Sequence, residues 1–185
     1  MSFSAEYSFA AAIAVMTLML SSCTGESIKT MYSNQETRIE SFIDAQLAAN
    51  SSAYAVSNKG SERVVLVAGE GEGLAPDDTV TFYYAGYTLT SASIESSNLF
   101  ASNRADILES AGWELTGGST APISAKLSEA GFVEGLRNGL EGVKAGEECL
   151  ILFSGKYGFG SHKLGTIPAN SALVYHIWVE SISKE

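Results

Sequence analysis

The sequence contains few of the residues on which most nucleophilic and metal sites depend. Its 185 residues include two Cys and two His. The sequence pattern assigns His162 to a loop and His176 to the outward face of a strand. A Ser-His-Asp triad or a zinc site requires more partners than this chain offers. We therefore predict no metal site, no cofactor and no catalytic nucleophile.

Positive charge is also scarce. The chain has 11 Lys and Arg residues against 21 Asp and Glu residues, which gives a formal net charge of -10 at pH 7. Proteins that bind nucleic acid need a positive surface that replaces the counterions of the phosphates. We therefore expect no nucleic-acid partner.

The apolar run of residues 9–20 is shorter than the ~20 residues that a bilayer-spanning helix needs. It leads directly into Leu20-Ser-Ser-Cys23, the pattern read by lipoprotein signal peptidase. Small residues let the protease approach, and the Cys thiol is the atom that becomes acylated. We therefore predict a signal peptide over residues 1–22 and lipidation at Cys23. A usual signal begins with positive charge, whereas residues 1–8 contain Glu6 and no Lys or Arg.

The second cysteine, Cys149, would be the only thiol left after cleavage and acylation. An internal disulfide is therefore excluded. Cys149 begins the apolar run Cys-Leu-Ile-Leu-Phe, so we expect it to pack as a small hydrophobic residue.

Residues 23–60 form a predicted tether and helix. Ser33-Asn-Gln-Glu36 has the spacing of a capping box, which predicts a helix from there to about Ala49. Apolar side chains form one stripe on this helix, at Ile39, Phe42, Ile43 and Leu47. The stripe either covers one side of the domain or forms a partner surface. We expect packing, because the stripe lacks the charged heptads of a coiled coil.

Residues 61–185 are predicted to form the main domain, and residues 131–180 are its most informative part. Apolar spacing predicts one short helix over Phe132–Leu140. A buried strand follows over 149–153, then a glycine-rich loop over 155–165. A last strand over 172–182 alternates, with Leu173, Tyr175, Ile177 and Val179 on the inner face. Its outer face carries His176 and Trp178, so we expect the N-terminal helix or a partner to cover it.

This order of elements resembles the FKBP-type peptidyl-prolyl isomerases. Val133-Glu-Gly-Leu in the short helix, Tyr157-Gly-Phe-Gly in the loop and Ile167-Pro-Ala-Asn-Ser before the last strand carry the likeness. Upstream, Asp77–Gly86 is similar to the early strand of the family and Asn98–Asn103 to its Phe-Asp-Ser turn. The resemblance implies an α+β fold, in which an antiparallel β-sheet wraps around a short α-helix. The helix over residues 33–49 would be an extra N-terminal element.

The resemblance also implies a proline-binding pocket. Its predicted catalytic residues are Tyr84, Phe100, Phe132, Val133, Phe159 and Tyr175, and its predicted substrate-binding residues are Ile123, Leu136 and Ile167. In the family, the residue at Val133 offers its backbone N–H to the substrate. For Ile123 and Tyr175, ordinary core packing is an equal alternative.

The sequence departs from the family at three pocket positions. Ala101 follows Phe100 where the family places Asp, which removes a carboxylate that helps to polarise the site. Leu136 stands in place of the usual Trp floor. Phe159 replaces a Tyr that donates its hydroxyl to bound ligand. The longer segment over residues 101–121 is an expected insertion, with a helix over 104–111 and a loop that contains Trp113.

We therefore expect a peptidyl-prolyl cis-trans isomerase that acts on X-Pro bonds of exported or envelope proteins. Its partners would be proline-containing polypeptides. The protein would lie in the bacterial cell envelope, where a lipid would anchor it to the outer membrane. Two alternatives stay open. One is an FKBP-like peptide-binding or chaperone lipoprotein with weakened catalysis. The other is a structural lipoprotein that assembles through the stripe on the helix.

Overall fold

The structure is a computed structural model that describes residues 6–113 and 120–185, with side chains from residue 25 onward. The chain divides into two units at residues 34 and 35. The second unit, Gln35–Glu185, contains the sheet and every cavity discussed below. Residues 35–60, predicted as part of the tether and N-terminal helix, are included in this unit.

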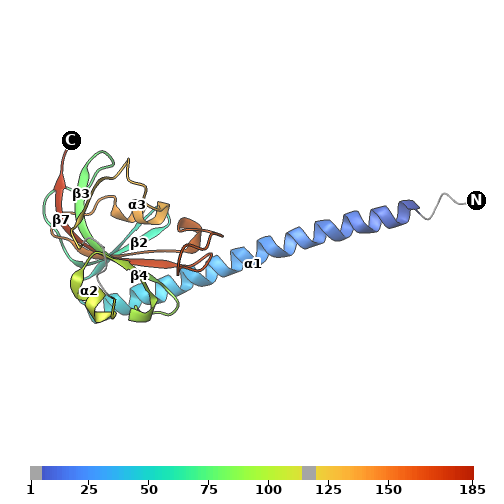
Figure 1. The fold of residues 1–185 in the computed structure, drawn as a ribbon, viewed down its shortest axis with the longest axis horizontal. Coiled ribbons are helices and arrows are strands. Elements are labelled where there is room, and N and C mark those ends of the chain that lie inside the picture. Colours follow the sequence, from blue (N-terminus) through green and yellow to red (C-terminus); the bar gives the residue numbers. More distant parts are fainter. Residues whose placement is uncertain (1–5, 114–119) are drawn as a thin grey trace, which may run out of the picture. The chain divides into compact units, whose positions relative to one another are not determined.

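Helix α1 runs without interruption over Glu6–Ala49 (Figure 1). The prediction that a helix begins at Ser33 is therefore wrong. Residues 26–32 contain no Gly or Pro that would stop a helix, and the Thr30 hydroxyl donates to the Glu26 carbonyl oxygen at 2.9 Å within α1. Among the described residues, no helix is both long enough and apolar enough to cross a membrane. Residues 1–5 of the predicted signal peptide lie outside the described residues.

Beyond residue 35, the apolar stripe of α1 is buried. Phe42 is 0% exposed, Ile39 and Ile43 are also buried, and Leu47 packs beside them. The interpretation of the stripe as a packing surface is confirmed. The last four turns of α1 thus belong to the core of the second unit.

The described residues form a seven-stranded sheet in which every pairing is antiparallel. Its strands are β1 (Tyr54–Asn58), β2 (Ser61–Val67), β3 (Thr79–Thr88), β4 (Leu99–Ser102), β5 (Ile123–Lys126), β6 (Glu148–Phe153) and β7 (Leu173–Ser183). The order across the sheet is β1-β2-β6-β7-β3-β4, and β5 also pairs with β3. Two further helices, α2 (Ala105–Ser110) and α3 (Glu134–Leu140), and the 3₁₀ turns Ser96–Asn98 and Gly155–Tyr157 complete the fold.

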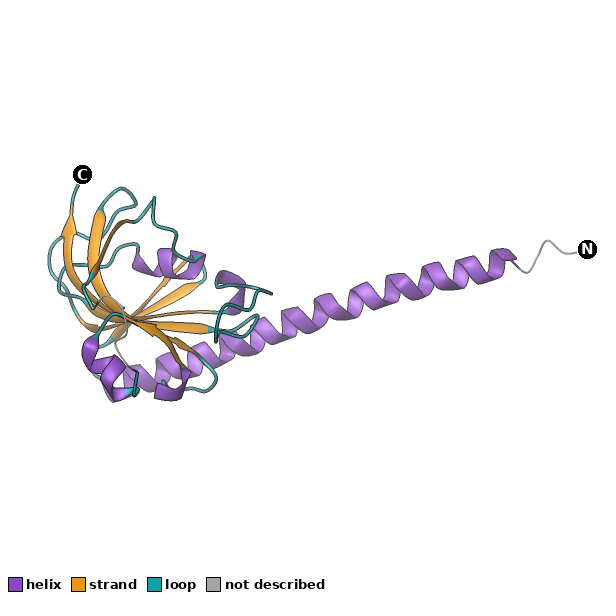
Figure 2. Cartoon of the chain, in the orientation of Figure 1, coloured by secondary structure: helices purple, strands orange, loops and turns teal. Residues whose placement is uncertain are grey.

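Helices lie on both sides of the sheet (Figure 2). Each face of the sheet carries its own hydrophobic cluster. Leu136 and Leu140 of α3 pack on one face with the inner residues of β7, which are Leu173, Tyr175, Ile177 and Val179. The other face is covered by α2 and by residues 39–43 of α1, which pack with Val174 and Trp178. The predicted alternation of β7 is confirmed, and so is the expectation that the N-terminal helix covers its outer face.

Helix α3 lies very close to strand β6. A Cβ placed on Gly135 would lie 2.2 Å from the ring of Phe153, and one on Gly139 would lie 2.2 Å from Ile151. Only glycine permits this approach. The helix begins at Glu134, two residues later than predicted, because the backbone at its N-cap residue Val133 is still extended (φ -59°, ψ 150°).

The buried Arg63 side chain fixes the other end of α3. Arg63 on β2 donates to the carbonyl oxygens of Gly139 and Glu141, each at 2.9 Å. Its Nε lies 3.3 Å from Oε1 of Glu147, and the two side chains are 9% and 2% exposed. Burial raises the pKa of Glu147, and the charge of Arg63 opposes that rise. Strand β2 therefore sets where α3 ends.

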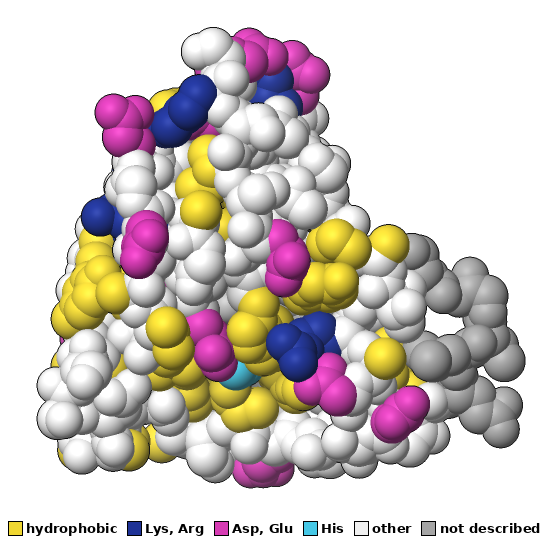
Figure 3. Space-filling model, turned by 90° about the vertical axis from the view of Figure 1, so that its left-hand side faces the viewer, with side chains coloured by type: hydrophobic (Ala, Val, Ile, Leu, Met, Phe, Trp, Pro, Cys, Tyr) yellow, Lys and Arg dark blue, Asp and Glu magenta, His cyan; other side chains and the backbone are white. Residues whose placement is uncertain are grey.

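The insertion over residues 101–121 forms the helix α2, and its residues 114–119 lie outside the described residues. Just before α2, the Arg104 guanidinium lies 4.4 Å from the ring centroid of Trp178, which stacks on His176 at 3.8 Å. Burial lowers the pKa of His176, whereas its contact with Glu148 at 2.8 Å opposes that change. Figure 3 shows one face of the molecule, on which hydrophobic side chains lie between separate charged ones. Trp113 is 41% exposed and lines none of the cavities discussed here.

Candidate functional site

A mostly apolar cavity of about 230 Å³ opens between α3 and the strands β3, β4, β5 and β7. Its walls are Phe82, Tyr84, Phe100, Ala101, Ile123, Gly131, Phe132, Val133, Leu136, Phe159 and Tyr175. We call it the aromatic cavity. Small-molecule and peptide sites are commonly concave and apolar with a few polar groups. This cavity has that character.

All but one of the predicted pocket residues line the aromatic cavity. The exception is Ile167, which is 5% exposed and belongs to the buried core cluster instead. Leu164 and Ile167 pair through their backbones, and Ile167 packs in the same cluster as Tyr175, so its role in substrate binding stays a prediction. Ile123 and Tyr175, for which core packing was an equal alternative, both reach the cavity wall.

Three residues of the wall were missed by the sequence reasoning. Phe82 lies two positions before Tyr84 on β3, so strand alternation places both side chains on one face, and that signal was readable. Ala101 was noted only as a departure from the family pattern. Gly131 lines the cavity next to Phe132, and no sequence pattern indicated this role.

Aromatic rings hold one another in place around Tyr175. The ring of Phe100 meets the ring of Tyr175 edge-on, with 5.6 Å between the ring centroids. The ring of Phe153 stacks on the ring of Tyr175, with 6.0 Å between the centroids. Gly86 makes room for this arrangement, since a Cβ there would lie 2.5 Å from the Phe100 ring. Such pairs add about 0.5–1.5 kcal/mol each beyond area burial. The walls are therefore preformed.

A buried amide fixes the strands that carry the site. Asn103 accepts a hydrogen bond from the Tyr84 N–H at 2.7 Å through Oδ1, and its Nδ2 donates to the Ala121 carbonyl oxygen at 3.0 Å. Asn103 lies near the start of the insertion and Ala121 at its end, so this side chain links both ends of the insertion to β3. Nothing in the sequence pattern indicated this role.

The phenols of Tyr84 and Tyr175 and the backbone amide of Val133 are polar groups of residues that line the aromatic cavity. Burial raises the pKa of Tyr84, and burial together with Tyr84 raises the pKa of Tyr175. Both hydroxyls therefore stay protonated at neutral pH and are available as donors. The Val133 N–H donates to no acceptor among the described residues. It is free to bind a carbonyl oxygen of a ligand.

The three departures from the family pattern all lie in the wall. Ala101, Leu136 and Phe159 line the aromatic cavity where the resemblance would place Asp, Trp and Tyr. The wall consequently contains no carboxylate among the described residues. What remains is an apolar chamber with hydrogen-bond donors and no charged group.

Comparisons with known proteins agree with this geometry. A family model described as FKBP-type peptidyl-prolyl cis-trans isomerase matches residues 70–180. FK506-binding protein 1 of Aspergillus oryzae is 25% identical over 118 residues, which are 64% of this chain and 94% of that protein.

Solved structures share the fold. FkpA from Escherichia coli superposes with a TM-score of 0.55 at 18% identity, over 97% of this chain and 73% of its own. A peptidyl-prolyl cis-trans isomerase from Pseudomonas syringae pv. tomato gives a TM-score of 0.56 at 16% identity, over 84% of this chain and 96% of its own. Since the family model spans more than half of the sequence, the chain belongs to the FKBP-type peptidyl-prolyl cis-trans isomerase family.

Proposed function

We propose that this chain catalyses cis-trans isomerisation of X-Pro bonds in exported or envelope proteins, at a reduced rate. The observation that carries the proposal is the free Val133 N–H at the edge of a preformed aromatic cavity. Eight positions taken from the family pattern line this cavity. There the Val133 N–H would donate to a substrate carbonyl oxygen, and the apolar walls would hold a proline ring.

The chemistry requires no nucleophile. Rotation about an X-Pro amide is slow because the C–N bond has partial double-bond character, and the half-rotated state has lost that resonance. That state is less polar along C–N than the planar amide, so apolar walls favour it relative to water. In this cavity, Phe100, Phe132 and Tyr175 would hold the proline ring while the Val133 N–H holds the carbonyl oxygen. A hundredfold acceleration needs only about 2.7 kcal/mol of selective stabilisation.

The experiment that tests the proposal is a prolyl isomerisation assay on the full chain with several X-Pro peptides. We expect acceleration above the uncatalysed rate. Equal rates with and without the protein for every peptide would refute catalysis.

Phe159→Tyr is expected to raise kcat/KM about fivefold. The added hydroxyl supplies a hydrogen bond to bound peptide of about 1 kcal/mol, which corresponds to roughly that factor. The measurement is the same isomerisation assay at matched protein concentrations. Val67→Tyr is the control, since it adds the same phenol at an exposed position of β2. If the two variants changed the rate equally, Phe159 would not be limiting the reaction.

A peptide-binding or chaperone function is the second candidate, and the cavity wall without a carboxylate favours it. Such a module would suppress aggregation of an unfolded protein while leaving isomerisation at the uncatalysed rate. Measuring both on one sample separates the two functions.

The membrane anchor is proposed from the sequence around Cys23. Cys23→Ala is expected to move the protein from the membrane fraction to the soluble fraction of cells, because the acylated thiol is removed. Cys149→Ala is the control, since Cys149 is a free cysteine buried in β6. Retention of the Cys23→Ala variant in the membrane fraction would contradict the anchor. Fractionation and immunoblotting measure both variants.

A further inference from the structure

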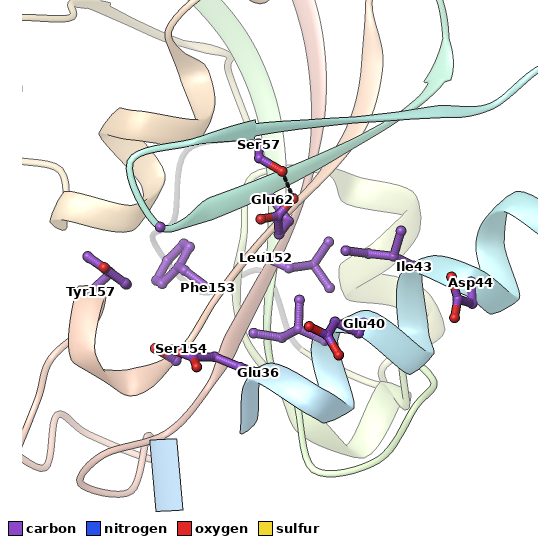
Figure 4. A pocket seen from close by; sticks show the side chains of 12 residues that line it. Glu36, Glu40, Ile43, Asp44, Ser57, Glu62, Leu152, Phe153, Ser154 and Tyr157 are labelled. Atoms are coloured by element: carbon purple, nitrogen blue, oxygen red, sulfur yellow. Dashed lines mark hydrogen bonds between the residues drawn. The ribbon is translucent and has the colours of Figure 1, made fainter. Parts of the chain in front are cut away.

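A second and larger cavity, of about 460 Å³, lies between α1 and the strands β1, β2 and β6. It is lined by Glu36, Ile39, Glu40, Ile43, Asp44, Ser57, Gly60, Glu62, Leu152, Phe153, Ser154 and Tyr157 (Figure 4). We call it the acidic groove. No residue of the aromatic cavity is among its lining residues, so the two sites are distinct.

Four carboxylates line the groove, and the Lys156 ammonium lies 5.0 Å from the ring centroid of Tyr157. Glu36, Glu40 and Asp44 follow one another at four-residue intervals on α1, which is about 6 Å per step. Glu62 faces them from β2 and accepts a hydrogen bond from the Ser57 hydroxyl. No Lys or Arg of the described residues forms an ion pair with any of these four carboxylates. Negative charge therefore accumulates along one wall.

A buried hydroxyl in the same groove lacks a partner. Ser154 is 2% exposed, and its Oγ makes no hydrogen bond within the described residues. Both Ser154 and Glu36 are among the lining residues drawn in Figure 4. Buried polar groups in folded proteins nearly always have a partner, so an unsatisfied one in a cavity wall indicates a ligand atom. This observation is independent of the carboxylates.

We propose that the acidic groove binds an extended polypeptide segment that carries Lys or Arg at alternate positions. Side chains two residues apart on an extended chain lie about 6.6 Å from each other, close to the helical step between the carboxylates of α1. The intervening apolar side chains would face Tyr157, which lies across the groove from Ile43 in Figure 4. A peptide N–H or C=O then satisfies the Ser154 hydroxyl.

The acidic groove shares a wall with the aromatic cavity. Phe153 lines the groove, and its ring stacks on Tyr175 of the cavity at 6.0 Å. Tyr157 and Phe159, two residues apart in one loop, line the groove and the cavity respectively. A client chain held in the groove would therefore be kept beside the cavity. Binding in the groove needs no proline, so it can be tested whether or not isomerisation occurs.

The test is a fluorescence anisotropy titration of the full chain with a labelled nonapeptide of alternating Lys and Val. A peptide with Glu in place of Lys is the ligand control. We expect the Lys peptide to bind and the Glu peptide not to bind at low salt. The triple variant Glu36→Gln, Glu40→Gln, Asp44→Asn should weaken binding about tenfold, since each exposed charge pair contributes a few tenths of a kcal/mol or more.

The matched control variant changes the same charge elsewhere. Glu70→Gln, Glu109→Gln and Glu180→Gln neutralise three exposed carboxylates outside the groove, and affinity should stay unchanged. Equal weakening by both triple variants would show a nonspecific charge effect and overturn the proposal. Full competition by spermine at the concentration of the Lys peptide would overturn it too, because the site would then recognise small cations rather than a polypeptide.

Ser154→Ala separates ligand binding from folding. Removing a hydroxyl that has no partner should leave the melting temperature unchanged or raise it, while the affinity for the Lys peptide falls about fivefold. Circular dichroism confirms that each variant is folded before titration. If the Ser154→Ala variant bound the Lys peptide as tightly as the wild type, the buried hydroxyl would not contact the peptide. That result would contradict the proposed binding mode.

Discussion

Replacing Val133 by proline is expected to lower kcat/KM for X-Pro isomerisation about 30-fold. Proline lacks the backbone N–H that would hold the substrate carbonyl oxygen. Leaving that oxygen without a donor in a closed apolar site costs about 2 kcal/mol, which is a factor of roughly 30 in rate. The measurement is kcat/KM in the isomerisation assay, with the full chain and one peptide series.

The fold should tolerate this substitution. Val133 has a φ of -59°, which is within the range that a proline ring imposes, and it precedes the first residue of α3. Its carbonyl oxygen, which accepts from the Arg137 N–H, is retained. The melting temperature is therefore expected to stay close to that of the wild type.

Val133→Ala is the matched control. Alanine keeps the N–H and removes only part of one wall, so we expect kcat/KM to fall less than about threefold. A proline variant as active as the alanine variant would show that the N–H plays no part, and catalysis would then rest on the aromatic walls alone.

Replacing Phe42 by alanine is expected to cost about 4 kcal/mol of unfolding free energy. Phe42 is 0% exposed and belongs to the cluster that joins α1 to the outer face of the sheet. Removal of a buried phenyl ring loses its transfer free energy and leaves a cavity, with typical costs of about 3–5 kcal/mol. For a domain of this size, the melting temperature should fall by about 10 °C. Thermal and urea unfolding followed by circular dichroism measure it.

Leu164→Ala is the control for this prediction. Leu164 is an exposed apolar residue of the loop before β7, and its removal should change unfolding free energy by less than about 0.5 kcal/mol. If Phe42→Ala were equally mild, residues 35–49 of α1 would not be part of the cooperative unit. The predicted large difference follows from burial alone, so it does not depend on any assignment of function.

The resemblance to the FKBP family suggested the candidate pocket residues, and periodicity indicated on which face of their elements several of them lie. Alternation along β7 placed Tyr175 on the inner face, and the same rule on β3 would also have placed Phe82 beside Tyr84. Helical spacing placed Leu136 and Leu140 on one side of α3, although the helix begins later than expected. Ile167, which the family motif suggested for the pocket, lies in a turn that has no period and pairs through its backbone with Leu164.

The sequence by itself determined the order of the elements of the main domain and the resemblance to the family, because these depend on local patterns and spacing, and that resemblance suggested the aromatic residues of the cavity. Tertiary structure alone decided that the second unit begins at Gln35, that Arg63 fixes the end of α3, and that α1 and β6 enclose an acidic groove. Those features join residues far apart in the chain. Their contacts arise only when the packed sheet brings the segments together, so no local pattern records them.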